Sequence, residues 1–480
     1  MATSGQHASA PIGRSKQYAG KAAMTLSTPS RFAADARAIC LLGAPLLANN
    51  LSIIGMQFAD TVMAGQLGAR DLAALAVGVG YYHLFLLFGL GTLMAVSPSV
   101  AHAFGANDTR GVTRYCRQAW WLALALAVVL VTGLMQVDRV LPALGIAPEI
   151  LPTAIGYVHA MSWGMPALLA FLALRYTSEG LGRTKPIMYF GFLGLTANVI
   201  GNWIFMYGKF GMPQLGAVGC GVATALSEWL MFLSMFAYMR RQRFYREFDF
   251  FARIDPPDWR VLRDLTRTGA PIGGSVLAEG GLFVCAALMI GGMGATLTAG
   301  HQIALNYASF MFMVPLAISS ATTIHVGHTL GRGDRDRARF AGLLGIGMCA
   351  TIMAMSAIGI LFFNDSIASL YTRDATVREI AAGLLLMAAI FQLSDGVQVG
   401  AAGALRGFKD TAIPMTMCIF SYWVVGFPLA YVFGVHKGGG PLYVWIGFIA
   451  GLTVSAVLLV SRYLYVSRRL LASAVGAGVT

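Results

Sequence analysis

The chain has 480 residues, of which 57% are hydrophobic and only 11% are charged, and its mean hydropathy is +0.67. These values exclude an ordinary soluble protein, in which about a quarter of the residues are charged, and they predict a membrane protein with several spans. The net charge of +13 does not indicate a nucleic-acid-binding protein, because the basic residues are spread over short connections between apolar runs and form no single patch.

Twelve apolar runs follow a polar, basic start of the chain, and each is long enough to cross about 30 Å of hydrocarbon as a helix. Residues 1–35 lack the apolar core of a secretory signal, so we expect a disordered cytoplasmic tail there. The sequence therefore predicts an all-α membrane protein with twelve transmembrane helices, at about 38–64, 72–103, 116–136, 152–177, 187–208, 216–239, 262–292, 297–329, 339–363, 377–404, 411–434 and 442–467.

The two halves of the chain are copies of each other. Residues 43–69 align without a gap on residues 269–295, at an offset of 226. Six spans return the chain to its starting side, so the repeats are parallel and related by an axis along the membrane normal. We expect two pseudo-symmetric six-helix bundles, an N-lobe at 36–240 and a C-lobe at 262–468, with a cytoplasmic linker at 241–261 and a cytoplasmic tail at 469–480.

Lys and Arg are distributed unevenly between the alternating connections. One side of the predicted membrane holds 27 of them and the other side holds six, while Arg175 lies inside a span. Basic residues concentrate on the cytoplasmic side of membrane proteins, so both termini are expected in the cytoplasm. The charged linker, interrupted by Pro256 and Pro257, is expected to include a short surface helix and to contact anionic lipid.

One acid, Asp60, lies near the outer end of the first span, and Gln57 is one turn before it. In the fifth span Asn198 and Asn202 are spaced i, i+4, so both amides point one way, and Thr224 of the sixth span could face them. Carboxylate, amide and hydroxyl oxygens can bind a dehydrated Na⁺ or hydrogen-bond a protonatable carboxyl group. Two simpler interpretations stay open: a solvated carboxylate at a helix end, and Asn contacts that only join helices.

The second half contains two further acids inside spans. Glu279 lies in the middle of the seventh span among small residues, with no basic residue within helical reach. Asp395 lies in the tenth span, with Gln392 and Gln398 one turn to either side on the same polar face. Ionisable groups in spans usually face a bundle interior or a water-filled cavity. We interpret both acids as candidate proton carriers and cation ligands, although a protonated Glu279 bonded to a neighbouring helix is an alternative.

The histidines predict no metal site, and the chain contains no phosphate-binding motif. His325 and His328 are three residues apart, but we expect no carboxylate near them and therefore no metal site there. His301 is expected to be a hydrogen-bonded interior histidine, with a pH-sensing role as the alternative. The chain has no Walker motif, so ATP hydrolysis is not the expected energy source.

Five segments resemble the multidrug and toxic compound extrusion (MATE) family, specifically its NorM-like bacterial branch. They are QFADTVMAGQLGARDLAALAVG, GANDTRG, GNWIFMYGKFGMPQLGAVGCGVATAL, TAGHQIALN and VQVGAAGALRGFKD, and the similarity runs in order from about residue 35 to 465. The resemblance implies the MATE fold, with two six-helix lobes around a central cavity, in a multi-pass protein of the bacterial inner membrane. It also implies rocker-switch efflux of cationic drugs and dyes in exchange for Na⁺ or H⁺.

The resemblance extends to individual residues. It implies an N-lobe cation site, which could hold Na⁺, and a pair of C-lobe acids, formed by Asp60, Asn198, Asn202 and Thr224, and by Glu279 and Asp395. Phe391 stands where NorM-like sequences often have a tyrosine, which removes an oxygen ligand from a C-lobe Na⁺ site. We expect the substrate to contact Glu279, Asp395, Gln57, Gln392 and Gln398.

The predicted mechanism is antiport, in which an organic cation and the coupling ion compete for shared or coupled carboxylates. The prediction includes no enzymatic activity, no cofactor other than Na⁺ or H⁺, no nucleic acid, and no obligate protein partner. A two-lobed monomer surrounded by membrane lipid is sufficient for this mechanism.

Two alternatives belong to other functional classes. A lipid-linked precursor flippase of the same superfold would need a basic cavity for pyrophosphate, whereas Arg175 is the only cation predicted inside a span, where it is expected to pair with Glu179. An intramembrane hydrolase would need a nucleophile and a base that face each other, and the acids lie on separate helices without such a motif. The sequence favours efflux.

Overall fold

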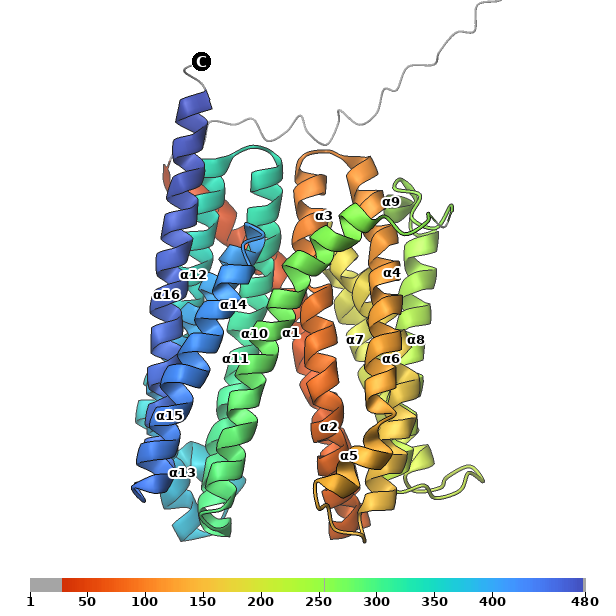
Figure 1. The fold of residues 1–480 in the computed structure, drawn as a ribbon, viewed down its shortest axis with the longest axis vertical. Helices are drawn as coiled ribbons and strands as arrows, with labels where there is room; N and C mark the ends of the chain where they lie inside the picture. Colours follow the sequence, from red (N-terminus) through yellow and green to blue (C-terminus); the bar gives the residue numbers. More distant parts are fainter. Residues whose placement is uncertain (1–27, 254, 478–480) are drawn as a thin grey trace, which may run out of the picture.

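The structure of the chain is a computed structural model that describes residues 28–253 and 255–477 (Figure 1). Within these residues the secondary structure is helical and contains no strand. The described helical segments include twelve that are long and apolar enough to span a membrane. This confirms the predicted all-α class and the predicted number of spans.

The first six spans form the N-lobe. Its second span consists of two helices, α2 and α3, and a short helix, α5, lies between two spans. The helices are α1 (Thr28–Leu67), α2 (Ala69–Leu93), α3 (Val96–Gly105), α4 (Thr109–Leu134), α5 (Val137–Ala143), α6 (Leu151–Gly180), α7 (Lys185–Phe205) and α8 (Ala217–Arg241).

The last six spans form the C-lobe. Its fifth span is a composite of α-helical and π-helical segments, a geometry that places side chains differently from a continuous α-helix. The elements are α10 (Trp259–Gly291), α11 (Ala295–Gly331), α12 (Arg335–Tyr371), α13 (Ala375–Gly407), α14 (Ala412–Ile419), η2 (Phe420–Gly426), α15 (Phe427–Leu429), η3 (Ala430–His436) and α16 (Pro441–Ala477).

The outermost helices extend into both predicted tails. The predicted tail boundary at residue 35 is wrong, because residues 28–35 belong to α1. Asp35 is buried there, and its Oδ1 accepts hydrogen bonds from Arg337 at 2.7 Å and from His325 at 3.0 Å, which fixes the backbone around it. At the other end α16 continues to Ala477. The remainder of the first predicted tail, residues 1–27, lies outside the described residues.

The linker between the lobes is anchored on α4. It contains a short helix, α9 (Arg243–Arg246), as the sequence predicts. The guanidinium group of Arg117 donates hydrogen bonds to the carbonyl oxygen of Asp249 at 2.6 Å and to the carboxylate of Asp255 at 2.7 Å. This hydrogen bond from Arg117 lowers the pKa of the Asp255 carboxyl group.

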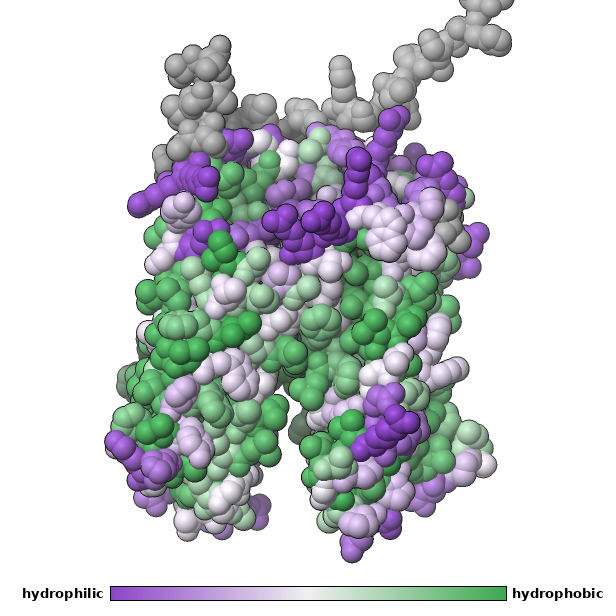
Figure 2. Space-filling model, in the orientation of Figure 1, coloured by the Kyte–Doolittle hydropathy of each residue, from purple (hydrophilic) through white to green (hydrophobic). Residues whose placement is uncertain are grey.

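The two lobes separate at one end of the molecule and meet at the other. Figure 1 shows α10 running diagonally from the N-lobe to the C-lobe, and Figure 2 shows a cleft between the lobes. We call the end with the cleft the open end. The opposite end carries the linker and, on the face drawn in Figure 2, a dense band of hydrophilic residues, and we call it the basic end.

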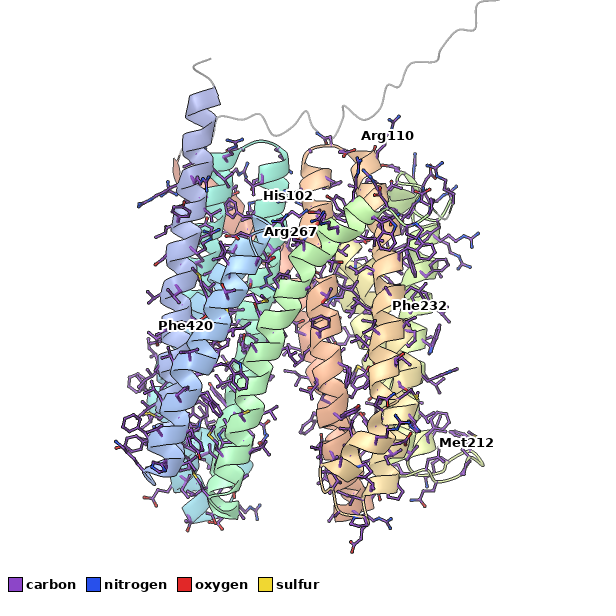
Figure 3. All side chains as sticks on the ribbon, in the orientation of Figure 1. His102, Arg110, Met212, Phe232, Arg267 and Phe420 are labelled. Atoms are coloured by element: carbon purple, nitrogen blue, oxygen red, sulfur yellow. The ribbon has the colours of Figure 1, made fainter. Side chains whose placement is uncertain are left out.

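Two hydrogen bonds between the lobes, one from each half of the repeat, close the basic end. Figure 3 shows His102 at this end and Met212 at the opposite, open end. The Nε2 atom of His102 donates to the carbonyl oxygen of Gly407 at 2.7 Å, and the Nε2 atom of His328 donates to that of Gly180, also at 2.7 Å. His102 and His328 are 226 residues apart, so these two contacts are related by the internal repeat. Each of them joins one lobe to the other.

The same repeat determines where two helices begin. Asp108 caps the start of α4 by accepting a hydrogen bond from the Gly111 backbone N–H at 2.9 Å. Asp334 caps α12 by accepting from the Arg337 backbone N–H at 3.0 Å. The capping acids occupy equivalent positions of the two halves, which explains why this short polar turn is present in both.

Candidate functional site

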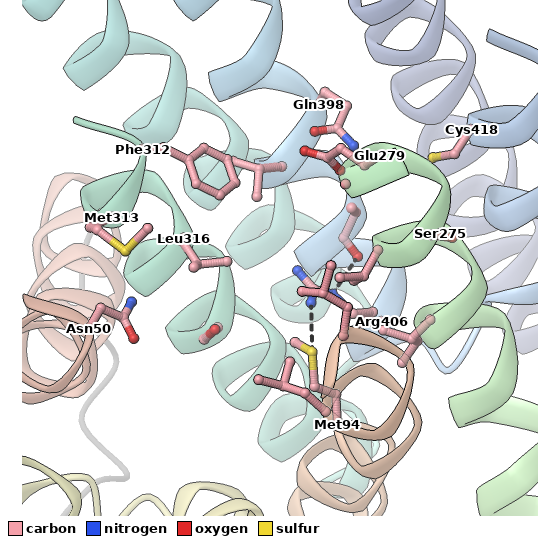
Figure 4. Close-up of a pocket in the computed structure, with 18 of the residues that line it drawn as sticks. Asn50, Met94, Ser275, Glu279, Phe312, Met313, Leu316, Gln398, Arg406 and Cys418 are labelled. Atoms are coloured by element: carbon pink, nitrogen blue, oxygen red, sulfur yellow. Dashed lines mark hydrogen bonds between the residues drawn. The ribbon is translucent and has the colours of Figure 1, made fainter. Parts of the chain in front are cut away.

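A cavity of about 440 Å³ lies between the lobes. Its walls come from α1, α2 and α6 of the N-lobe and from α10, α11, α13, α14 and α16 of the C-lobe. Most lining side chains are apolar, which is typical of a site for an organic ligand. They include Leu46, Ile53, Leu86, Leu90, Phe283, Phe312, Met313 and Leu316, and Figure 4 shows part of this wall.

The internal repeat also relates the two walls of the cavity. The α1 wall and the α10 wall use the same helical face, so each α1 residue is matched by an α10 residue 226 positions later. The pairs are Leu46 and Ile272, Asn50 and Val276, Ile53 and Glu279, Ile54 and Gly280, and Gln57 and Phe283. Each wall therefore carries different polar groups, and only the α10 wall carries an acid at this matched position.

Three of the five residues expected to contact substrate line this cavity. Glu279 projects from α10, Gln398 from α13, and Gln57 from α1, where its Nε2 atom lies 3.3 Å from Nε2 of His83. The other two, Gln392 and Asp395, are absent from the cavity lining and are at most 3% exposed. The polar face predicted on the tenth span is thus divided, with Gln398 at the cavity and two residues behind its wall.

The C-lobe acids lie in a cluster with unusual hydrogen bonding. Glu279 and Asp395 act on each other electrostatically, and Tyr422 of η2 is a close neighbour of Glu279. In the described part of the chain, three buried side chains of this cluster have polar atoms without a partner, namely Gln392, Gln398 and Tyr422. Buried polar groups are nearly always hydrogen-bonded, so this cluster is suited to a ligand, an ion or water.

Tyr422 is a residue that the sequence analysis missed. Phe391 is buried, and its ring packs against Phe283 and Trp445. A phenylalanine side chain has no oxygen, so this position offers no ligand to a cation. The Tyr422 hydroxyl group supplies an oxygen from another helix instead. Its aromatic, apolar sequence surroundings gave no signal, because it reaches Glu279 from a π-helical segment.

The four residues predicted for the N-lobe cation site lie together in one hydrogen-bonded chain. Asn202 Nδ2 donates to Asp60 Oδ1 at 2.6 Å and to Asn198 Oδ1 at 3.2 Å, and Asn198 Nδ2 donates to Thr224 Oγ1 at 3.0 Å. Both asparagines are fully buried, and Asp60 is half-buried. The Oδ1 atom of Asn202 has no partner among the described residues, so one oxygen is free to bind a cation.

The cavity contains a cation that the sequence analysis placed elsewhere. Arg175 pairs with Glu179, with Nε and Oε1 2.8 Å apart, as predicted. Arg406, however, belongs to the last turn of α13 and lines the cavity instead of lying in a surface loop. The prediction that Arg175 is the only cation inside a span is therefore wrong, because α13 continues to Gly407, beyond its predicted end.

Arg406 has neutral hydrogen-bond partners. Its Nη2 atom donates to Ser319 Oγ at 2.9 Å and its Nε atom to the Ala402 carbonyl oxygen at 3.3 Å, while Figure 4 shows its contact with Met94. No carboxylate forms an ion pair with it within the described residues, although Glu279 acts on it electrostatically. The cavity thus contains both a carboxyl group and a guanidinium group that lack an ion-pair partner.

The histidines differ in part from the sequence analysis. A carboxylate does join His325, because Asp35 of α1 lies 3.0 Å from its Nε2 atom, so the prediction that no carboxylate is near is wrong. The two residues are 290 positions apart, and no sequence pattern links them. His301 is an interior histidine that accepts a hydrogen bond from Trp445 Nε1 at 3.2 Å, as predicted.

One more buried acid, Glu228 of α8, escaped the sequence analysis. It is 4% exposed and lies beside Tyr82 of α2, which is 2% exposed. The signal was the same as for Glu279, a single acid at the centre of an apolar span.

The family model described as MatE matches the chain twice, at residues 45–204 and 271–432. Over 451 residues the chain is 43% identical to the "Probable multidrug resistance protein NorM" of Xanthomonas campestris pv. campestris, covering 93% of this chain and 98% of the relative. It is 39% identical over 444 residues to the "Multidrug resistance protein MdtK" of Yersinia pseudotuberculosis, covering 92% and 97%.

Two solved structures show the same fold. The eukaryotic MATE transporter AtDTX14 superposes with a TM-score of 0.82 at 18% identity, over 92% of this chain and 99% of that one. A multidrug resistance MATE transporter of the MOP superfamily in an outward-facing conformation gives a TM-score of 0.82 at 22% identity, over 91% and 96%. The twofold family match agrees with the duplication seen in the sequence.

Proposed function

Since this chain belongs to the multidrug and toxic compound extrusion family, whose members are transporters and not enzymes, we propose that it exports amphipathic organic cations in exchange for Na⁺ or H⁺. Two relatives that match more than nine-tenths of the chain are named multidrug resistance proteins. Multidrug efflux is the activity that these names share, and the substrate class and the coupling ion are proposed from the site.

The observation that carries the substrate class is Glu279 in an apolar cavity. Its carboxyl group faces the space between the lobes, and no basic residue pairs with it in the part of the chain that the structure describes. The Phe283, Phe312 and Met313 side chains around it can repack against apolar ligands of different shape. An amphipathic cation supplies both the positive charge and the apolar surface that this wall favours.

The charges of the cavity argue against the lipid-linked precursor flippase. Arg175 is neutralised by Glu179, and Asp410 is neutralised by Arg462, with 2.7 Å between Oδ2 and Nε. Arg406 remains without an ion pair, but Glu279 opposes it in the same space. A pyrophosphate group carries at least two negative charges and would need more unpaired cations than this cavity provides.

The direction of transport follows from the proposed orientation. Lys and Arg are concentrated in the connections of the basic end, so we assign this end, with both termini, to the cytoplasm. The structure then corresponds to an outward-open state, closed on the cytoplasmic side by the contacts of His102 and His328. A substrate in the cavity can leave to the outside from this state.

The coupling ion acts through its different affinity for the two states, since a ligand shifts an equilibrium only by such a difference. In the outward-open state, an ion from outside binds the Asp60 chain, where the free Asn202 oxygen and the Asp60 carboxylate can hold Na⁺ or a proton. The ion-loaded N-lobe then favours closure of the open end. Closure brings the cavity to the cytoplasmic side, where the next substrate binds Glu279.

Efflux of ethidium from proteoliposomes tests this proposal, with a Na⁺ gradient and a pH gradient imposed separately on purified protein. Efflux driven by either gradient supports it and identifies the coupling ion. Empty liposomes treated in the same way give the background. If neither gradient drives efflux, the antiport proposal fails, and flipping of a fluorescent lipid-linked pyrophosphate becomes the next activity to measure.

A further inference from the structure

Glu228 is a buried acid that the proposed mechanism does not use. It lies near the midpoint of α8 (Ala217–Arg241), 4% exposed, and its Oε2 atom has no partner in the described part of the chain. An ionised carboxylate without a partner is costly at such a position. The group must therefore be protonated or bound to a cation for most of its time.

The titratable groups around Glu228 are acidic or neutral. From the neighbouring helices it faces Asp60 of α1, Tyr82 of α2 and Tyr157 of α6. No lysine, arginine or histidine is among them in the described residues. The surroundings therefore offer hydrogen-bonding hydroxyl groups but no positive charge that would keep the carboxylate ionised.

The packing around Glu228 leaves room for the carboxyl group. Gly164 of α6 lies directly opposite, and a Cβ atom at that position would overlap with Oε2 of Glu228. The Tyr82 hydroxyl group, also without a partner among the described residues, lies beside the carboxyl group. A glycine, an acid and a phenol from three helices thus form a small polar site inside the N-lobe.

This site adjoins the chain of hydrogen bonds at Asp60. Thr224 and Glu228 are spaced i, i+4 on α8, so they share a face and are about 6 Å apart along the helix axis. Thr224 accepts the last hydrogen bond of that chain, from Asn198. Asp60 and Glu228 also act on each other electrostatically. Ionising both would place two negative charges in a low-dielectric interior without a cation.

We propose that Glu228 carries a proton that is exchanged in each transport cycle, in addition to the ion that binds at Asp60. This inference rests on the proposed function and assigns the N-lobe a second coupling group. The proton arrives from the outer solution when the cleft is open, and the Tyr82 hydroxyl group beside Glu228 can transfer it, because a hydroxyl group can donate and accept. It leaves to the cytoplasm in the opposite state.

Infrared difference spectroscopy of the full-length purified protein tests whether Glu228 exchanges a proton. Protonated and ionised carboxyl groups absorb at different frequencies, so spectra taken in acidic and alkaline buffer count the groups that change. Glu228→Gln should remove one such group from the difference spectrum. The control is Ser227→Ala, since Ser227 is equally buried but bonds only to its own helix at Ala223. A Glu228→Gln spectrum identical to wild type would overturn the inference.

Transport in proteoliposomes tests whether the exchange belongs to the cycle. With the Na⁺ concentration equal on both sides, the protons taken up per tetraphenylphosphonium exported should fall by one in Glu228→Gln and return in Glu228→Asp. An unchanged proton count in Glu228→Gln would overturn the inference. If wild-type protein moves no substrate under any gradient, the proposed function fails, and the infrared comparison still decides whether Glu228 exchanges a proton. If Glu228→Gln purifies poorly, Glu228→Met replaces it in the infrared comparison, because methionine also lacks a carboxyl group.

Discussion

The two lobes share one scaffold but place their acids differently. Asp60 of the N-lobe aligns with Ala286 of the C-lobe, and Glu279 of the C-lobe aligns with Ile53 of the N-lobe. Asp60 is held by Asn202 within its own lobe, with a donor-acceptor distance of 2.6 Å, whereas Glu279 faces the cavity between the lobes. The Asp60 carboxyl group is thus bound by the Asn202 side-chain amide, and the Glu279 carboxyl group is available to a ligand.

This difference suggests a division of labour within a duplicated protein. The side-chain contacts that the repeat preserves, such as the hydrogen bonds from His102 and His328 to backbone carbonyl oxygens, determine how the lobes meet. The charges that the repeat does not preserve concern what each lobe binds. We infer that the N-lobe holds the coupling ion and the C-lobe holds the substrate, and the following predictions test that division in order of decreasing effect.

Glu279→Gln should cause the largest loss of substrate recognition, because it removes the negative charge on the cavity wall while preserving its shape. We expect the transport efficiency of ethidium efflux, its maximal rate divided by the half-saturating ethidium concentration, to fall by tenfold or more. This corresponds to at least about 1.4 kcal/mol. Initial rates over a range of ethidium concentrations in proteoliposomes measure this. The matched control is Ile53→Leu, at the equivalent N-lobe position on the opposite wall, which should transport normally.

A double variant sharpens the same comparison. Ile53→Glu combined with Glu279→Ile moves the acid to the equivalent position of the other lobe, inside the same cavity. If cavity charge alone decides substrate binding, this variant should recover much of the efflux that Glu279→Gln loses. Recovery to the wild-type rate would show that substrate recognition is not specific to the C-lobe, and our division would then be wrong for the substrate.

Asp60→Asn should separate ion coupling from substrate binding. We expect tetraphenylphosphonium to bind the purified variant within about threefold of the wild-type affinity, a difference of about 0.6 kcal/mol. Gradient-driven efflux should nevertheless be lost, because the hydrogen-bonded chain from Asn202 to Thr224 would lack its carboxylate. Isothermal titration calorimetry and efflux measure the two properties. A variant that lost binding as well would place substrate in the N-lobe.

The internal repeat made much of this site predictable from sequence. The apolar runs give twelve spans, the offset of 226 with six spans in each half gives parallel repeats, and the same offset aligns Glu279 with Ile53. Local spacing was enough to bring Asn198 and Asn202 onto one face, since i, i+4 positions on a helix must point together. These inferences need only helix geometry within a span or a constant register between the two halves.

The remaining features depend on tertiary contacts, which neither the internal repeat nor the helix period predicts. Asp35 meets His325 across 290 positions because α1 packs against the other lobe. Arg406 lines the cavity because α13 continues past its last apolar residues, and helix ends follow weakly from hydropathy. Tyr422 reaches Glu279 from a π-helical segment, whose side chains do not follow the α-helical period.

Arg406→Gln should have a smaller effect, in the opposite direction to Glu279→Gln. Removing this guanidinium group takes a positive charge out of the cavity that receives the cation. We expect tetraphenylphosphonium to bind about two- to fivefold more tightly, or about 0.4 to 1 kcal/mol, when titrated at low ionic strength. The control is Arg378→Gln, since Arg378 pairs with Asp365 and neither residue lines the cavity. Weaker binding in Arg406→Gln would mean that the guanidinium group orients Glu279 instead of opposing the substrate.

The contacts at the basic end should show the smallest effects, and these should be equal for the two lobes. His102→Ala and His328→Ala each remove one hydrogen bond between lobes, worth about 1 kcal/mol, so each should shift the closed-to-open ratio of this end by about fivefold. Distances between spin labels across that end, measured by pulsed electron paramagnetic resonance, report the ratio. Equal shifts would show that the repeat preserves the energy of lobe contact as well as its geometry. A shift in only one variant would show that the two acceptors, Gly180 and Gly407, are equivalent in position but not in function. The difference between the lobes would then include the contacts that close the basic end.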